Sequence, residues 1–211
     1  DSAYFCQVKD KTGKIIYRLP NHHFDIKATS PGRGTIVLLG GVIDYGEINR
    51  NLFWIRPNYV DTVYSTSDWT DVRPYYIIQR NNRAADYAWS VRMKVGDITR
   101  EDAEREQLCN VYALKSGLLF NYLFNPKQQG AGFCPANGKS KTISRLFKND
   151  IDSYCPSIDL WQAIAYKTLY QKEDYLYLLI DAFKFFEEGA KSPFPDLTEE
   201  SNPVLVKLKL K

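Results

Sequence analysis

The chain has 211 residues, of which 44% are hydrophobic and 25% are charged, and this length predicts one domain with a sizeable core. Its 28 basic and 25 acidic residues give a net charge of +3, which indicates neither a strong nucleic-acid binder nor a membrane-surface binder. No apolar run approaches the roughly 18 residues of a transmembrane helix, and nothing resembles a signal peptide.

The first 97 residues are predicted to be rich in β-strands. Short runs of β-branched or aromatic residues, bounded by Pro, Gly, Asn or Asp, predict strands at residues 14–19, 35–39, 52–55, 60–64 and 75–79. The clearest strand is expected at 87–95. There Tyr87, Trp89 and every second residue after them are large and apolar, while the residues between them are small or polar.

The pattern changes after Gly96, and residues 98–190 are predicted to be helical. Thr99 to Asp102 match a capping box, and apolar residues recur at helical spacing as far as Leu123. A glycine-rich loop is expected at 127–142, followed over 157–188 by one helix or two.

Apolar residues alternate with lysines near the C-terminus, which predicts a last strand at 203–211. The sequence therefore predicts a single α+β domain over 1–211. Its N-terminal sheet, mostly antiparallel, would pack against a C-terminal helical layer, and the last strand would rejoin that sheet.

The four cysteines form no C-x-x-C pair, which argues against a zinc ribbon or a thioredoxin motif. A proline follows both Cys134 and Cys155, so both are expected in ordered loops. Of the three possible pairings we expect Cys134–Cys155 with Cys6–Cys109; the alternative is four free thiols in a cytosolic protein. Two disulfides, together with a start at Asp1 that suits a processed or trimmed chain, predict a secreted or periplasmic protein.

Histidine occurs only at the adjacent positions 22 and 23, so mechanisms that need two separated histidines are excluded. A metal site would need His22, His23 and Asp25 to converge from irregular backbone, because neighbouring residues of a strand point to opposite faces. We expect an exposed histidine pair, no metal site and no Cys–His nucleophile.

Three short segments could carry enzyme chemistry, and they lie around Arg18, Ser65-Thr66-Ser67 and Glu104-Arg105-Glu106. In their order along the chain they resemble the ADP-ribosyltransferase toxins. The resemblance implies that Arg18 binds the pyrophosphate of NAD and that Ser65 braces the cleft. It also implies that Glu106 stabilises the oxocarbenium-like centre while Glu104 orients the acceptor. The competing interpretation is a surface arginine, a Ser/Thr-rich turn and an acidic helix start.

Aromatic residues make up 14% of the chain, and several lie in predicted loops or beside Asn and Asp. Tyrosine and tryptophan provide rigid, amphipathic contact area for recognising proteins and sugars. Tyr64, Trp69 and Tyr75 are the candidate binding residues, with Trp69 the one most readily placed on a surface. The first hypothesis is an exported, disulfide-stabilised microbial factor, such as a virulence factor, that binds a protein or glycan without a cofactor. The alternative is a secreted ADP-ribosyltransferase-like enzyme that uses NAD.

Overall fold

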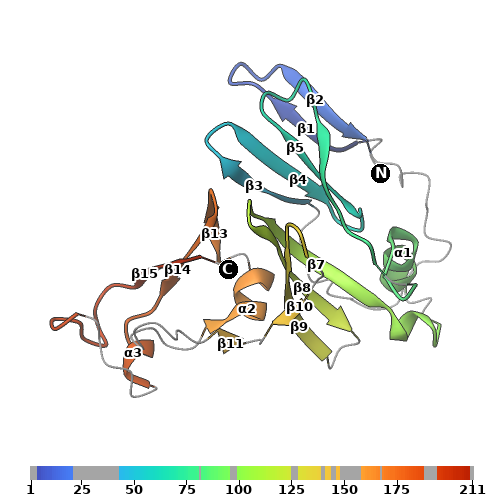
Figure 1. Ribbon diagram of the computed structural model, residues 1–211. Coiled ribbons are helices and arrows are strands. Elements are labelled where there is room, and N and C mark those ends of the chain that lie inside the picture. Colours follow the sequence, from blue (N-terminus) through green and yellow to red (C-terminus); the bar gives the residue numbers. More distant parts are fainter. Residues whose placement is uncertain are drawn as a thin grey trace.

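Figure 1 shows a computed structural model of the chain, which describes residues 4–20, 43–80, 82–95, 99–124, 128–138, 141–143, 146–147, 158–166, 168–187 and 194–209. Within those ranges fifteen strands form five small antiparallel sheets, accompanied by three short α-helices and one 3-10 turn. The predicted α+β fold with a C-terminal helical layer is therefore wrong, because most of 98–190 that the structure describes is strand.

The N-terminal part of the chain forms a hairpin and a four-stranded meander. The hairpin pairs β1 (Tyr4–Lys9) with β2 (Ile15–Pro20). The meander consists of β3 (Ile43–Asn49), β4 (Leu52–Pro57), β5 (Thr62–Thr66) and β6 (Arg73–Ile77), in that order. Four predicted strands overlap β2, β4, β5 and β6 and are confirmed, while the strand expected at 35–39 lies outside the described residues.

Residues predicted as the clearest strand instead form helix α1 (Tyr87–Val95). The prediction was wrong because the carboxylate of Asp86 caps the helix: its Oδ1 accepts a hydrogen bond from the Trp89 backbone N at 2.7 Å. The capping box at Thr99 and Asp102 is confirmed, since each side chain accepts from the other's backbone N–H. However, it is followed only by the 3-10 turn η1 (Asp102–Glu104), where a long helix was expected.

A four-stranded sheet follows, where a helix and a loop were predicted. Its strands are β7 (Glu106–Ala113), β8 (Gly117–Phe124), β9 (Gln128–Pro135) and β10 (Lys141–Ile143), in the order β10-β9-β8-β7. The chain turns at Gly117, whose φ is +154° and where a Cβ would overlap the Cys134 carbonyl. The apolar spacing looked helical because both faces of this sheet are buried, with Val111 on one face and Tyr112 on the other.

The C-terminal part adds two sheets and two helices. A small pair, β11 (Leu146–Phe147) and β12 (Ile158–Asp159), leads into α2 (Leu160–Ala165). The last sheet contains β13 (Tyr170–Lys172), β14 (Tyr175–Ile180) and β15 (Val204–Leu208), and α3 (Lys184–Glu187) lies between β14 and β15 in the chain. The predicted last strand exists, but it pairs with β14 and does not rejoin the N-terminal sheet.

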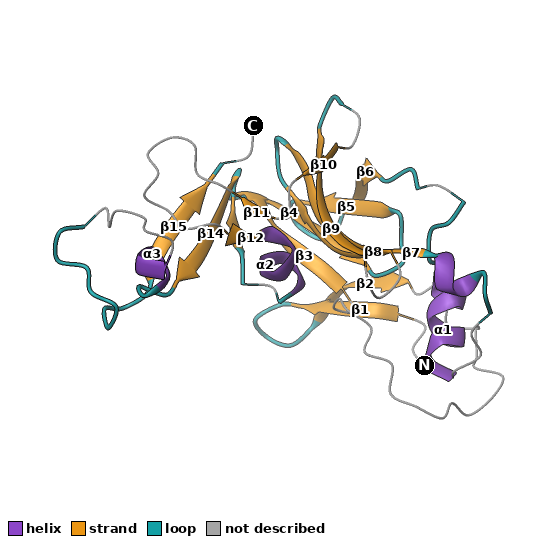
Figure 2. Cartoon of the chain, turned by 90° about the horizontal axis from the view of Figure 1, so that it is seen from below, coloured by secondary structure: helices purple, strands orange, loops and turns teal. Residues whose placement is uncertain are grey.

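The β7–β10 sheet is the middle layer of the molecule (Figures 1 and 2). One face packs against the β3–β6 meander around Trp54, Val63 and Val111. The other face packs against α2 and the β13–β15 sheet around Leu119 and Ile164. None of the helices in the described ranges is long and apolar enough to cross a membrane.

Gln171 on β13 joins the three layers through its buried side chain. Its Nε2 donates to the carbonyls of Glu47 at 3.0 Å and Ala113 at 2.5 Å, and its Oε1 accepts from Trp54 Nε1 at 3.1 Å. Gly46 makes room for this contact, because a Cβ there would lie 2.6 Å from Trp54 Nε1. One amide therefore fixes β13 against both neighbouring sheets.

The predicted disulfides are not formed. Cys6, Cys109 and Cys134 are free thiols, and Cys155 lies outside the described residues. Cys109 is 1% exposed inside the middle layer, whereas Cys6 belongs to the separate β1–β2 hairpin, so the predicted Cys6–Cys109 pair has no place in this fold. The expectation of a disulfide-stabilised secreted virulence factor loses the observation on which it rested.

Candidate functional site

The residues of the ADP-ribosyltransferase resemblance are spread over three sheets. Arg18 lies on β2, where its guanidinium stacks 5.3 Å from the Tyr4 ring centroid. Ser65 lies on β5, paired with Trp54 and Arg73. Glu104 lies in the exposed turn η1 and Glu106 begins β7. Of the three pockets that the structure describes, only one is lined by any of these residues, and that residue is Glu106.

The predicted binding aromatics are half-buried and packed. Trp69 has a positive φ of 66°, and its ring lies between those of Phe53 and Tyr17, with centroids 6.5 and 6.0 Å away. Tyr75 packs edge-on against its neighbour Tyr76 with centroids 4.6 Å apart. Tyr64 is also half-buried. These rings support the meander, whose exposed large hydrophobic side chains are instead Tyr45 and Ile77.

Both faces of the β13–β15 sheet carry apolar side chains. Leu176, Leu178 and Ile180 point into the core. The intervening positions form what we call the outer sheet face. It comprises Tyr170, Lys172, Tyr175, Tyr177, Leu179, Leu205, Lys207 and Lys209. Because successive side chains of a strand point to opposite faces, the sheet has a second apolar surface that is exposed to solvent.

Two cross-strand pairs build the outer sheet face. Leu179 is opposite Leu205, and these side chains are 65% and 63% exposed. Tyr170 is opposite Tyr177, with ring centroids 6.4 Å apart, and Tyr170 is 64% exposed. These four residues surround a hollow of about 420 Å³. Single exposed leucines are common on proteins, but a contiguous apolar patch marks a contact surface.

The charges on the outer sheet face are all positive. Lys207 Nζ lies 3.7 Å from the Tyr175 ring centroid, and Lys209 Nζ lies 5.7 Å from it. Lys172 is exposed beside the hollow. Cation–π contact holds the ammonium groups against the aromatic surface, where they still face water. The face presents three lysines and no acidic residue.

A second concave region lies between β3 and β13, with a volume of about 450 Å³. Tyr45 and Tyr170, which are 74% and 64% exposed, stand among its lining residues. Asp44 and Asn110 also line it, although both are almost fully buried. Exposed tyrosine rings beside buried polar groups are the combination found in sites for polar small molecules and sugars.

The buried charge next to this groove is structural. Asp44 Oδ2 accepts from Arg56 Nη1 at 2.9 Å and from the Val111 backbone N at 3.1 Å. Burial lowers the pKa of the Arg56 guanidinium, and Asp44 opposes that shift. Burial also raises the pKa of the nearby Cys109 thiol to about 12, which favours the neutral thiol over the thiolate.

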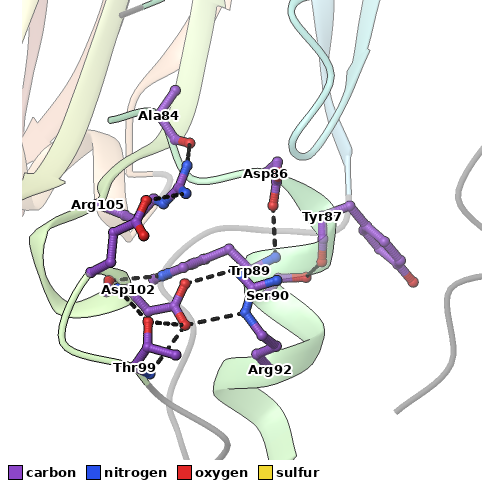
Figure 3. A network of polar contacts seen from close by, with 10 residues as sticks. Ala84, Asp86, Tyr87, Trp89, Ser90, Arg92, Thr99, Asp102 and Arg105 are labelled. Carbon is purple, nitrogen blue, oxygen red and sulfur yellow. Dashed lines mark hydrogen bonds and ion pairs between the residues drawn. The ribbon is translucent and has the colours of Figure 1, made fainter. Parts of the chain in front are cut away.

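A polar network ties α1 to η1 (Figure 3). Asp102 accepts from Arg92 Nε at 3.1 Å and Nη2 at 2.7 Å, and its carbonyl accepts from Trp89 Nε1 at 3.0 Å. The Arg92 hydrogen bonds outweigh the effect of burial and lower the pKa of Asp102 to about 2. Because Asp102 is 3% exposed, the network anchors the helix and offers no reactive carboxylate.

Among the described residues, no three His, Cys, Asp or Glu side chains are grouped to hold a metal ion, and His22, His23 and Asp25 lie outside those residues. Sequence reasoning identified the lysine alternation of the last strand but missed the matching alternation in 175–180, where every residue is apolar or aromatic. Comparison of the chain with protein-family models, with curated proteins and with solved structures finds no match.

Proposed function

We propose that the protein is a binding protein that recognises another protein through the outer sheet face. The observation that carries the proposal is the exposure of Tyr170, Leu179 and Leu205 on a sheet whose opposite face already contributes to the core. A sheet needs only one apolar face to fold, so the second apolar face suggests a function other than stability.

The charges of the face define the chemistry of the partner. An apolar side chain of the partner would fill the hollow between Leu179 and Leu205. Aspartate or glutamate side chains next to it would contact the ammonium groups of Lys172 and Lys207. A nucleic acid would use the tyrosines and lysines but would leave both leucines without a contact, so an acidic protein segment suits the whole face better.

Selection of peptides from a random library against the purified protein tests the proposal. We expect the selected peptides to share one or two large apolar residues flanked by Asp or Glu. Replacement of both leucines, Leu179→Ser with Leu205→Ser, should weaken binding at least about tenfold. Ile77→Ser on β6 is the matched control, because Ile77 is 71% exposed on a different sheet. Peptides that bind the double variant as well as the unaltered protein would refute the proposal.

Glycan binding at the groove between β3 and β13 is the second candidate, favoured by the exposed tyrosine rings that line it. A glycan array probed with the protein tests this function. Tyr45→Ala should abolish any array signal, whereas Tyr166→Ala should preserve it, because Tyr166 is 69% exposed and lines none of the described pockets. An array signal that survives Tyr45→Ala would contradict glycan binding at this groove.

A further inference from the structure

A cleft of about 740 Å³ lies between β6 and the β8–β9 part of the middle layer. Tyr76 and Ile78 line one side of it, and Leu118, Phe120 and Tyr122 line the other. Its volume falls in the range of sites for small molecules, and its walls are mostly apolar. The cleft is separate from the outer sheet face and shares no residue with it.

Two glycines leave room for the aromatic rings on the floor of this cleft. Gly130 is opposite Tyr122 and Gly132 is opposite Phe120 in the β8–β9 ladder. A Cβ at either glycine would overlap the ring of its partner, so both rings lie across the bare backbone of β9. With side chains at these glycines the rings would have to move away from the sheet, which means into the cleft. The glycines therefore keep open a space that Phe120 and Tyr122 would otherwise fill.

The two ends of the cleft differ in chemistry. Arg80 and Glu106 lie at the Tyr122 end, because Glu106 begins the strand in which Leu108 is opposite Tyr122. The Arg80 guanidinium already forms an ion pair with Asp61 at 2.5 Å. At the other end, Cys134 is opposite Leu118, and its thiol donates to the Gly138 carbonyl at 3.5 Å. The floor between Leu118 and Tyr122 is about 14 Å long, at ~3.4 Å per residue.

We propose that this cleft binds a planar, uncharged, ring-containing small molecule with a hydrogen-bonding group at one end. The planar body would stack on the Phe120 ring, since aromatic rings offer their faces to flat ligands, and the Tyr122 ring, tilted 45° from that of Phe120, would flank it. The polar group would meet Arg80 and Glu106. Because Asp61 already neutralises Arg80, an anionic ligand would be repelled by Glu106, whereas an amide can donate to the Glu106 carboxylate and accept from the Arg80 guanidinium.

Three probes of similar size test each part of the proposal by ligand-observed NMR titration: naphthalene-2-carboxamide, naphthalene-2-carboxylate and decanamide. We expect the aromatic amide to bind more tightly than the charged acid and more tightly than the flexible aliphatic amide. It should also slow alkylation of Cys134 by iodoacetamide, followed on the Cys134 peptide by mass spectrometry. Tighter binding of the carboxylate or decanamide, or no protection of Cys134, would overturn the assignment.

Glycine substitutions connect the binding to the position of the rings on the floor. Gly132→Ala should displace the Phe120 ring into the cleft and weaken the aromatic amide roughly five- to tenfold. Gly13→Ala is the matched control, because Gly13 lies between β1 and β2, does not line the cleft, and its Cβ would have no neighbour within 4 Å; it should change affinity less than about twofold. If Gly132→Ala does not fold, Ala136→Trp at the exposed rim should obstruct the cleft and weaken binding to the same degree. If the folded Gly132→Ala or Ala136→Trp protein binds the aromatic amide with unchanged affinity, the proposal is refuted.

Discussion

Replacing Asp102 with Asn should show how much the polar network between α1 and η1 contributes to stability. The carboxylate accepts both Arg92 hydrogen bonds and the Thr99 backbone bond of the capping box, while its residue is 3% exposed. Its pKa is lowered from 3.8 to about 2, which corresponds to about 2 kcal/mol at ~1.36 kcal/mol per pKa unit. The side chain of Arg92 is 35% exposed, so solvent screening makes this value an upper bound.

The sign of the pH dependence follows from the direction of the shift. A carboxyl whose pKa is lower in the folded state stabilises the protein above its unfolded pKa, and this stabilisation disappears as the pH falls through the folded pKa. The contribution of Asp102 should therefore be complete above about pH 5 and largely lost by about pH 2. Asn carries no charge, so Asp102→Asn should lack this part of the pH dependence.

Urea unfolding of both proteins at pH 6 and at pH 2.5 measures the effect. We expect the variant to be less stable by up to about 2 kcal/mol at pH 6 and by less than about 1 kcal/mol at pH 2.5. Glu101→Gln is the neighbouring control, because its carboxylate is 82% exposed and pairs only with Arg105 among the described ion pairs; it should cost about 0.5 kcal/mol or less. A difference that stays the same at both pH values would show that Asp102 stabilises through packing rather than charge.

Three further predictions concern the core. Asp44→Asn should lower the free energy of unfolding by about 3–5 kcal/mol in denaturant titrations, because it leaves the fully buried Arg56 without its counter-charge; a loss below about 1 kcal/mol would contradict this. Gly117→Ala should cost more than about 2 kcal/mol in thermal unfolding, since its Cβ would lie 2.8 Å from Pro135 Cα, and a stability near that of the unaltered protein would refute the close approach. Cys109 should resist a disulfide reagent at pH 8 until the protein unfolds, because its thiol is buried and has a pKa of about 12; rapid labelling in the native state would refute this.

The N-terminal strands could be predicted because local signals and tertiary packing agree there. Each of β2, β4, β5 and β6 is a short run rich in β-branched or aromatic residues, and β2, β4 and β5 end at a polar residue or a proline. The prediction for 87–95 was wrong because it rested on the alternation of apolar and polar residues, whereas the N-cap at Asp86 favours a helix. Asp86 stands three residues before Trp89, which is the spacing of an N-cap bond, and this short-range signal was present in the sequence.

The β7–β8 hairpin shows why periodicity alone misleads in a doubly buried sheet. Leu108, Val111 and Leu118 belong to the core against the meander, while Tyr112 and Leu119 belong to the opposite core. Together they give the three- and four-residue spacings of an amphipathic helix, although no single face carries them. Gly117 was the signal against a helix, because a glycine between two apolar runs marks a turn more often than a helix interior.

For the outer sheet face, the sequence predicts the solvent-facing side of β15 but not that of β14. Lysines alternate with apolar residues along β15, so the sequence shows directly which side of that strand faces water. Along β14 every residue is apolar or aromatic, and nothing in the sequence separates Leu178 in the core from Leu179 on the surface. Only the register that sets Leu179 opposite Leu205 places both leucines on the lysine side. β14 is apolar on both faces, whereas β15 carries lysine on one of them. The lysine side is therefore the side on which the sheet has apolar surface that the fold leaves unburied, and it is the face through which we propose that the protein binds its partner.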